Sequence, residues 1–304
     1  MTAVAALRTV EEIALDHGCA VEREVPMAGL TSVGIGGPAE WLVLPAEGAR
    51  VPALLRDLHA EGERVRFLGN GTNLLVGDAG VRGVVLSVAR LRGEPRFEGT
   101  RGRVQAGASL PHLVRSAVAL GLRGIEFAEG IPGSVGGAAV MNAGAYGGDM
   151  GKILRRVWIA SPDGRLRERV VRPEEFGYRR SPLGEELVLE AEIELSEDDP
   201  ERLREEVRAL RARRLASQPV GRRSMGCVFQ NPAGASAGRL IDEAGLKGAR
   251  RGGAVVSGRH GNYLLNTGGA TAEDFLALLE EVREAVFRRT GILLREEIRV
   301  WRDE

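Results

Sequence analysis

The chain has 304 residues, of which 43% are hydrophobic and 28% charged, as in a globular protein with room for two or three domains. Its 42 basic and 42 acidic residues give a net charge of zero, which argues against a nucleic-acid scaffold or an anionic membrane surface as partner. With only two cysteines, Cys19 and Cys227, and four histidines, we expect no disulfide framework and no metal site.

The first residues do not resemble a targeting segment. Glu11 and Glu12 come too early for a secretory signal, and no apolar run approaches the length of a membrane span. We therefore expect a cytoplasmic enzyme with small-molecule substrates, acting as a monomer or a weak oligomer.

The first part of the chain alternates helices and strands around two loops rich in glycine. In order, the residue pattern predicts a helix over 4–16, a loop over 26–37, a strand over 39–44, a helix over 49–59, a strand ending before Gly69, and strands over 74–76 and 83–88. This succession is typical of a small α/β unit.

The rest of the chain continues the mixture of helices and strands. The pattern predicts strands within 96–106, a helix over 110–120, a hairpin of 157–160 and 166–171, a strand over 186–195, a charged helix over 201–215, a loop over 222–232, a helix over 237–244, strands over 254–256 and 263–265, a helix over 272–290 and a strand over 296–301. We expect an α+β protein of three modules.

The stretch 124–147 contains six glycines after Glu129, among small apolar residues. Glycine in this density is costly in chain entropy, so it suggests that the backbone passes very close to something. Main-chain N–H groups arranged in this way can cradle a pyrophosphate. A tightly packed glycine corner is the other interpretation, and both stay open on these residues alone.

A second glycine loop, Gly-Asn-Gly-Thr-Asn at 69–73, follows a predicted strand. It lacks the lysine of a P-loop and does not match the G-x-G-x-x-G pattern. Its glycines, short polar side chains and N–H groups suit a diphosphate, although a simple hairpin loop is the plainer reading. Two such loops in successive modules favour a dinucleotide held by both.

Five sequence blocks carry a resemblance to a known family. They are F-L-G-N-G-T-N-L-L, G-I-E-F-A-E-G-I-P-G-S-V-G-G-A-A-V-M-N-A-G-A-Y-G, Y-R-R-S, G-C-V-F-Q-N-P and L-R-E-E-I-R. In the same order and over nearly the whole chain, they resemble UDP-N-acetylenolpyruvoylglucosamine reductase, the flavoenzyme that completes UDP-N-acetylmuramate for bacterial peptidoglycan. The long glycine block is highly specific, and the other blocks are modest individually.

The resemblance implies a fold and a division into domains. It implies an FAD-binding fold of the vanillyl-alcohol oxidase type, made of two α+β subdomains, and a C-terminal α+β substrate-binding domain. The corresponding ranges are 1–92, 93–196 and 197–292, with the last strand, 293–304, returning to the first subdomain. The short run from Tyr178 to Glu201 leaves no room for an inserted substrate-capping loop, so the chain resembles the shorter type of the family.

The resemblance also implies which residues hold non-covalent FAD, with NADPH as co-substrate. The implied FAD-binding residues are Gly36, Gly69, Asn70, Gly71, Thr72, Asn73, Leu74, Glu129, Gly130, Ile131, Pro132, Gly133, Ser134, Gly136, Gly137, Asn142, Ala143, Gly144 and Tyr146.

Three residues match the catalytic positions of the family. Hydride addition to an enolpyruvyl ether needs a cation and an acid at the conjugated carboxylate, and a proton donor at the other carbon. Arg179, with Arg180 as the fallback, matches the cation, and Glu297 matches the acid. Cys227 stands where many members carry serine, and a thiol is a stronger acid than an alcohol.

Further residues are implied to contact the substrate: Tyr178, Arg214, Gln230, Asn231 and Arg299. Gln230 stands where lysine is frequent in the family, so a charge contact to the substrate phosphate is not expected there. Strand alternation predicts that Glu297 and Arg299 face inward and Glu296 faces outward.

The expected activity is the NADPH-dependent, FAD-mediated reduction of UDP-N-acetylglucosamine enolpyruvate. One alternative is an oxidase of the same fold acting on an alcohol or sugar. Such enzymes often tether FAD to histidine or cysteine, and the four histidines lie outside the glycine blocks. Another alternative is a non-catalytic nucleotide-binding regulator, which would not need Arg179, Cys227 and Glu297 together.

Overall fold

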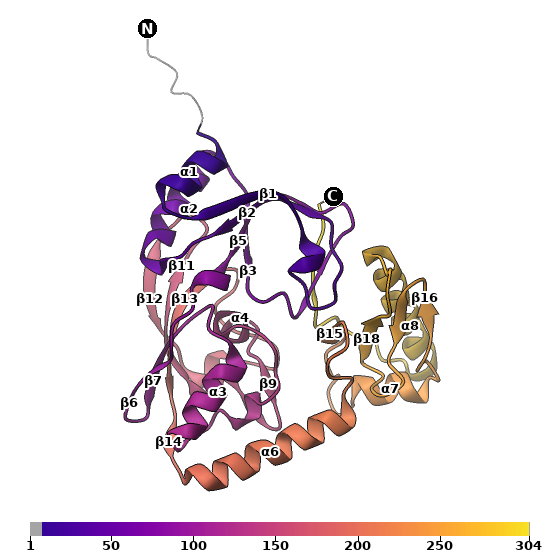
Figure 1. The fold of residues 1–304 in the computed structure, drawn as a ribbon. Coiled ribbons are helices and arrows are strands. Elements are labelled where there is room, and N and C mark those ends of the chain that lie inside the picture. Colours follow the sequence, from indigo (N-terminus) through magenta and orange to yellow (C-terminus); the bar gives the residue numbers. More distant parts are fainter. Residues whose placement is uncertain (1–7, 304) are drawn as a thin grey trace. The chain divides into compact units, whose positions relative to one another are not determined.

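The computed structural model describes residues 8–303 and divides into two compact units (Figure 1). Unit 1 comprises the chain up to Val25 with residues 39–70 and 82–207. Unit 2 comprises residues 26–38, 71–81 and the chain from Arg208 onward. The three-module division expected from the sequence stays a prediction.

The described part of unit 1 contains two larger sheets and two strand pairs. The first has the order β1-β2-β5-β3 and consists of β1 (Ala20–Pro26), β2 (Pro38–Leu44), β5 (Val81–Ser87) and β3 (Val65–Leu68). β3 and β5 are parallel, with Val65 opposite Val84. Helices α1 (Val10–Asp16) and α2 (Val51–Ala60) share a buried apolar core with β2 and β5. The core forms because each helix carries its apolar residues on one face.

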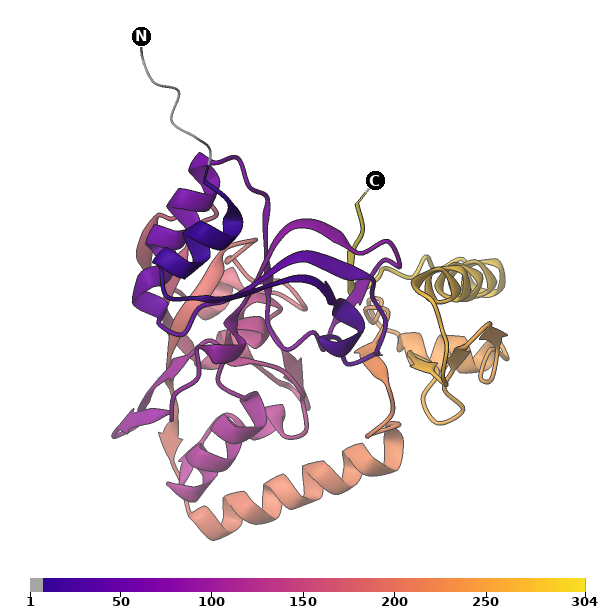
Figure 2. The same cartoon turned by 45° about the horizontal axis from the view of Figure 1, so that its top comes forward.

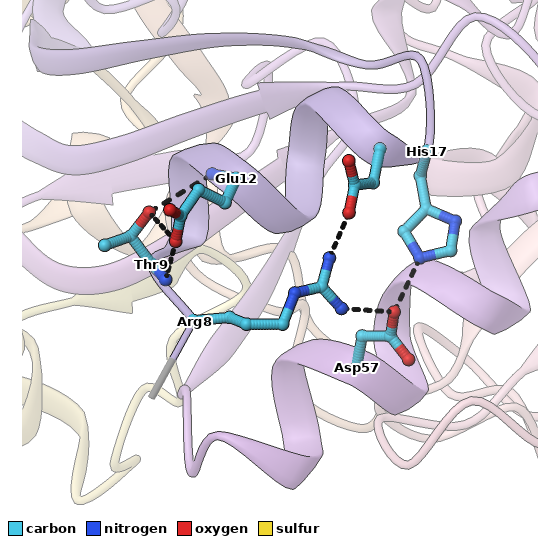
Figure 3. Close-up of polar contacts among 6 residues, drawn as sticks. Arg8, Thr9, Glu12, His17 and Asp57 are labelled. Carbon is cyan, nitrogen blue, oxygen red and sulfur yellow. Dashed lines mark hydrogen bonds and ion pairs between the residues drawn. The ribbon is translucent and has the colours of Figure 1, made fainter. Parts of the chain in front are cut away.

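Polar contacts connect α1 to α2 around Asp57 (Figure 3). The Asp57 carboxylate accepts hydrogen bonds from Arg8 at 3.2 Å and from the His17 ring at 2.9 Å. The hydrogen bond from His17, ahead of the contacts with Arg8, holds the pKa of Asp57 below its usual value. At the start of α1, Thr9 and Glu12 form a capping box.

The second sheet of unit 1 is antiparallel, with the order β12-β11-β13-β7-β6. Its strands are β12 (Leu166–Val170), β11 (Leu154–Ala160), β13 (Leu187–Glu194), β7 (Arg101–Gln105) and β6 (Arg96–Glu98). Helices α3 (Leu110–Ala119) and α4 (Val135–Val140) bury their apolar residues in the core of this sheet. Smaller elements complete the unit: β8 (Leu122–Arg123) with β14 (Ser196–Glu197), the pair β9 (Gly144–Ala145) and β10 (Gly148–Asp149), and α5 (Met150–Ile153).

Helix α6 (Pro200–Ser217) contains the last residues of unit 1 and the first residues of the final stretch of unit 2, which begins at Arg208. Its one buried residue is Leu203, which belongs to the core of unit 1. A helix that is polar nearly all round owes little of its stability to core packing.

Unit 2 is built on an antiparallel sheet with the order β15-β18-β17-β16. Its strands are β15 (Ser224–Cys227), β18 (Tyr263–Asn266), β17 (Ala254–Val256) and β16 (Arg250–Arg251). Helix α8 (Ala272–Thr290) lies beside these strands (Figure 2), and α7 (Ala237–Glu243) shares their apolar core. Asp78 accepts hydrogen bonds from the first main-chain N–H groups of α8.

Unit 2 also contains a parallel pair formed by β4 (Leu74–Val76) and β19 (Arg299–Trp301). The core of the unit therefore takes residues from distant parts of the chain: Val33, Ile35 and Leu75 pack with Phe229 and Phe275.

Most of the expected elements are present, with three corrections. The helix expected over 4–16 starts at Val10 because Thr9 caps it, and residues 4–7 lie outside the described part. The loop expected over 222–232 contains β15, which its glycine and serine concealed. The final strand begins at Arg299, so alternation does not extend to Glu297. Strand β1 and helix α4 were not predicted.

Within residues 8–303, no helix is both long and apolar enough to cross a membrane. The same part of the chain holds no group of three or more acidic, histidine or cysteine side chains arranged for a metal ion.

Candidate functional site

The two predicted glycine loops meet in unit 1, at Ser134. Ser134 is 1% exposed, and its hydroxyl caps α4 by accepting the N–H of Gly137 at 3.3 Å. A Cβ on Gly69 would lie 2.7 Å from the Ser134 hydroxyl oxygen, a distance that real side chains essentially never show. Gly69 therefore allows the first loop to pass directly beside the start of the second.

Packing explains some of the glycines in the long block. A Cβ on Gly136 would come within 2.8 Å of the Ala106 side chain, and one on Gly144 within 2.6 Å of the Gly148 carbonyl oxygen. At Gly147, by contrast, a Cβ would meet no atom of the described chain within 4 Å. The packing interpretation thus holds at particular positions and does not exclude a ligand at the others.

The residues of these loops fit a dinucleotide. Glu129 is the only carboxylate between residues 129 and 147, so little negative charge there opposes a diphosphate. The close approach of Gly69 to Ser134 brings together two segments that consist of main chain and small side chains. Main-chain N–H groups in such segments can bind a diphosphate.

Asn142 joins the glycine block to the segment that carries Arg179. Its side-chain amide donates to the Gly177 carbonyl at 2.9 Å and accepts the Gly151 N–H at 2.8 Å. Gly177 and Arg180 exchange two main-chain hydrogen bonds around a tight turn. Since Asn142 is 3% exposed, it holds this turn from inside unit 1.

Arg179 occupies the third position of that turn with a φ of 53°. The guanidinium carbon lies 5.0 Å from the centre of the Tyr178 ring, and that ring is exposed. Asn142, Tyr146 and Arg179 are three of the four described non-glycine residues with a left-handed backbone. Such conformations cost about 1–3 kcal/mol each and tend to cluster at functional sites.

The second part of the 69–73 loop lies in unit 2, against the loop before β2. A Cβ on Gly71 would lie 2.0 Å from the Leu30 carbonyl oxygen, and the Gly71 carbonyl accepts the Ser32 N–H at 3.0 Å. A Cβ on Gly36 would lie 2.9 Å from the side chains of Met27 and Val76. Glycine is thus required where these predicted FAD-binding segments touch.

Asn73 connects the same loop to Glu297. The Asn73 side chain donates to the Glu297 carbonyl at 3.0 Å, and the Asn73 carbonyl accepts the Arg299 N–H at 2.9 Å. A predicted FAD-binding residue and a predicted catalytic residue are therefore held together. Arg299 is exposed, and its contact with the substrate stays a prediction. Glu296 pairs with Arg283 on α8.

Cys227 ends β15 next to a β-bulge. Ser224 pairs with Leu265 and Cys227 with Tyr263, so β15 has one extra residue between the two pairs. Gly226 lies in this bulge with a φ of 78°. Bulges re-aim the following side chain and are common beside active sites.

Asn262 fixes the segment that follows Cys227. Its amide accepts the Phe229 N–H at 3.0 Å and donates to the Phe229 carbonyl at 2.7 Å, while its own carbonyl accepts the Val228 N–H. On the other side, the Glu297 N–H donates to the Val228 carbonyl at 2.8 Å. The segment after Cys227 is thereby held between Asn262 and Glu297. Sequence reasoning missed Asn262, because an asparagine before a strand resembles an ordinary loop residue.

The other predicted substrate-binding residues of unit 2 have structural contacts. Gln230 donates to the Glu296 carbonyl at 3.3 Å, and Asn231 accepts the Ala237 N–H at the start of α7. Arg214 lies in the last turn of α6 and is half-buried.

Tyr263 connects several of these groups electrostatically. Burial raises the pKa of its phenol far above the usual value, and negative charge at Cys227 and Glu297 adds to the increase. The charge of Arg214 and a hydrogen bond from it lower the pKa, with smaller effects than burial. Arg214, Cys227, Glu297 and Tyr263 therefore form one interacting cluster, with a phenol that stays neutral.

Comparisons with known proteins give consistent results for the two parts of the chain. The FAD binding domain family matches residues 39–169, and the C-terminal domain of UDP-N-acetylenolpyruvoylglucosamine reductase matches residues 218–301. The reductase of Geobacter sulfurreducens is 44% identical over 93% of this chain and 94% of its own length. That of Heliobacterium modesticaldum is 44% identical over 91% and 90%, respectively.

Solved structures agree with these matches. The reductase from Thermus caldophilus superposes with a TM-score of 0.80 at 38% identity, covering 93% of this chain and all (100%) of the other. A berberine bridge enzyme variant has a TM-score of 0.50 at 11% identity, covering 63% of this chain and 44% of the other, a likeness of fold alone. The expected fold, an FAD-binding fold of the vanillyl-alcohol oxidase type with a C-terminal α+β domain, is confirmed.

Proposed function

This chain belongs to the UDP-N-acetylenolpyruvoylglucosamine reductase family, and from this premise we propose that it reduces UDP-N-acetylglucosamine enolpyruvate to UDP-N-acetylmuramate with NADPH. Bound FAD would supply the chemistry by taking hydride from NADPH and giving it to the methylene carbon of the enolpyruvyl group. The observation that carries the proposal is the placement of Cys227 and Glu297 on either side of one hydrogen-bonded segment in unit 2.

The glycine loops would hold FAD. In unit 1, Gly69 and Ser134 provide a contact between two main-chain segments that carry little negative charge. In unit 2, Gly71 and Asn73 connect the same loop to residues 30–32 and to Glu297. Main-chain N–H groups stabilise the diphosphate of a dinucleotide without requiring lysine.

The charge that develops on the substrate carboxylate needs stabilisation. Hydride addition at the methylene carbon places negative charge on the adjacent carbon and its conjugated carboxylate. We assign the guanidinium of Arg179 and the carboxyl group of Glu297 to this carboxylate. A planar guanidinium binds both oxygens of a carboxylate, and a protonated Glu297 can donate a hydrogen bond to one.

Cys227 would complete the reaction by giving its thiol proton to the carbon next to the carboxylate. The bulge at Gly226 and the Asn262 contacts fix the main chain on both sides of this thiol. Positioning of this kind lowers the entropy cost of proton transfer. The thiolate would then recover its proton from solvent before the next turnover.

The half-reactions can be tested separately in Cys227→Ala, with Cys19→Ala as the matched control. Cys19 is a buried residue of the α1–α2 core in unit 1. We expect NADPH to bleach the flavin at the wild-type rate in both variants. In Cys227→Ala, recovery of the flavin band with the enolpyruvyl substrate under nitrogen should be at least about 100-fold slower, in line with the loss of a general acid. Recovery at the wild-type rate would remove Cys227 from the mechanism.

Failure of the wild-type flavin to recover with this substrate would overturn the proposed activity itself. A cytoplasmic location and a monomeric or weakly associated state remain part of this proposal. Size-exclusion chromatography with light scattering tests the second.

A further inference from the structure

The phenol of Tyr263 is a buried polar group in unit 2 that no step of the proposed reaction uses. Its side chain is 7% exposed, and its ring packs edge-on against His260 with the ring centres 5.0 Å apart. Its O–H donates to the side-chain oxygen of Gln218 at 2.8 Å. Tyr263 is also the cross-strand partner of Cys227.

Gln218 lies one helical turn beyond Arg214, since its N–H donates to the Arg214 carbonyl at 2.9 Å. Arg214 and Gln218 are half-buried, whereas the residues between them, 215–217, are exposed. Side chains four residues apart lie on one face of a helix. Gln218 directly follows α6 and continues the face of the helix that carries Arg214, so this is the face that meets Tyr263.

The hydrogen-bonding groups of the phenol determine which neighbour accepts from Tyr263 and which donates to it. A phenol has one O–H donor and acceptor lone pairs on the same oxygen. Because Gln218 accepts the O–H, the lone pairs remain available to a cation, and the Arg214 guanidinium hydrogen bonds to this oxygen. Arg259 donates to the Leu215 and Gln218 carbonyls, so the end of the helix is held in place as well.

We propose that Tyr263 is a positioning residue for the substrate diphosphate, acting through Arg214. Gln218 orients the phenol, the phenol oxygen holds the guanidinium, and the guanidinium binds the diphosphate in a fixed geometry. A fixed guanidinium loses less conformational entropy on binding than a free one. This inference rests on the proposed function and on the contact between Arg214 and the substrate that the family resemblance implies.

The test is a double-mutant cycle of Tyr263→Phe and Arg214→Ala in the FAD-loaded protein. Tyr263→Phe keeps the buried ring and removes only the hydroxyl. We expect it to raise KM for the enolpyruvyl substrate about three- to tenfold, the range for one hydrogen bond, with kcat changed less than about twofold. In the Arg214→Ala background, the same substitution should change KM less than about twofold.

Gln218→Leu removes the group that accepts the Tyr263 O–H, so it should also raise KM for the enolpyruvyl substrate. Thr267→Val is the matched control, since the Thr267 hydroxyl makes an exposed hydrogen bond to the Gly253 carbonyl in the same unit. It should leave KM unchanged. The FAD content and the flavin absorption spectrum should be unchanged in every variant, a readout that a general loss of structure would alter.

Two results would overturn the inference. The first is an equal effect of Tyr263→Phe with and without Arg214, and the second is a fall in kcat at constant KM. Binding of UDP-N-acetylglucosamine, measured by calorimetry, separates this inference from the proposed activity because it needs no turnover. A weaker affinity in Tyr263→Phe that disappears in the Arg214→Ala background would support the inference even if the wild-type protein reduced no enolpyruvyl substrate.

Discussion

Replacing Asn262 with alanine should destabilise unit 2 strongly, because it removes two buried hydrogen bonds at once. The substitution removes both partners of the Phe229 main chain, whose N–H and carbonyl contact the Asn262 amide at 3.0 and 2.7 Å. Phe229 is fully buried, so water cannot replace those partners readily. Each unsatisfied buried group costs about 1–3 kcal/mol, so the two groups together predict a loss of roughly 2–6 kcal/mol in the free energy of unfolding.

Urea unfolding of the FAD-loaded protein, followed by circular dichroism and by flavin fluorescence, measures this loss. Thr267→Val, which removes one exposed hydrogen bond to main chain, should cost only about 0.5–1 kcal/mol. Asn262→Asp keeps the acceptor for the Phe229 N–H but sets a carboxylate oxygen against the Phe229 carbonyl. It should therefore be destabilised at neutral pH and recover partly in acid, where the carboxyl group can donate.

The same substitution has a functional consequence. Because Asn262 fixes the segment after Cys227, Asn262→Ala should slow flavin recovery with substrate while leaving the bleaching by NADPH unchanged. An alanine variant within about 0.5 kcal/mol of wild type would refute the reasoning, since it would mean that the Phe229 groups find other partners.

Three further outcomes are expected. Gly71→Ala should weaken FAD binding at least about tenfold in a fluorescence titration, because its Cβ would lie 2.0 Å from a carbonyl oxygen. Gly147→Ala controls for backbone strain, since both glycines have a positive φ, but its Cβ would meet no described atom within 4 Å, so its effect on FAD binding should be smaller. Gly226→Ala should cost about 1–2 kcal/mol of stability from its φ of 78° alone, and unchanged urea unfolding would contradict this. Burial, with a smaller contribution from Lys247, lowers the pKa of His260 in the folded protein, so on acidification the unfolded chain protonates this histidine first. The free energy of unfolding should therefore fall as the pH drops below about 6.5. His260→Gln should flatten this pH dependence in thermal melts.

The sequence predicted the regular elements well where apolar periodicity was strong. Helices α2, α3 and α8 and strands β13 and β17 have nearly the expected bounds, whereas β11 begins three residues before the expected start. Strand β15 was missed because Ser-Met-Gly-Cys shows no alternation of apolar and polar residues. Its pairing with β18 also includes a bulge, which becomes visible only when the partner strand is known. The strand expected over 296–301 begins only at Arg299, because Glu296 and Glu297 contact residues 228–230 and the Asn73 side chain, whereas β19 pairs with β4.

The resemblance predicts the residues of the candidate site, and their roles stay predictions. The structure brings two pairs of them together, Glu297 with Asn73 and Gly69 with Ser134. The residues that hold them in place gave no signal of their own. Asn262 is more than thirty residues from the main chain that it binds, so its contacts depend on the tertiary fold.

The assembly of unit 2 from three separate stretches of chain has a consequence for synthesis. Residues 26–38 and 71–81 leave the ribosome well before residues 208–304, yet Val33, Ile35 and Leu75 belong to the same apolar core as Phe275. Strand β4 likewise has no partner until β19, near the end of the chain, has been translated. The nascent protein must therefore carry exposed apolar segments through most of its translation, and premature termination anywhere before β19 leaves unit 2 without its last strand.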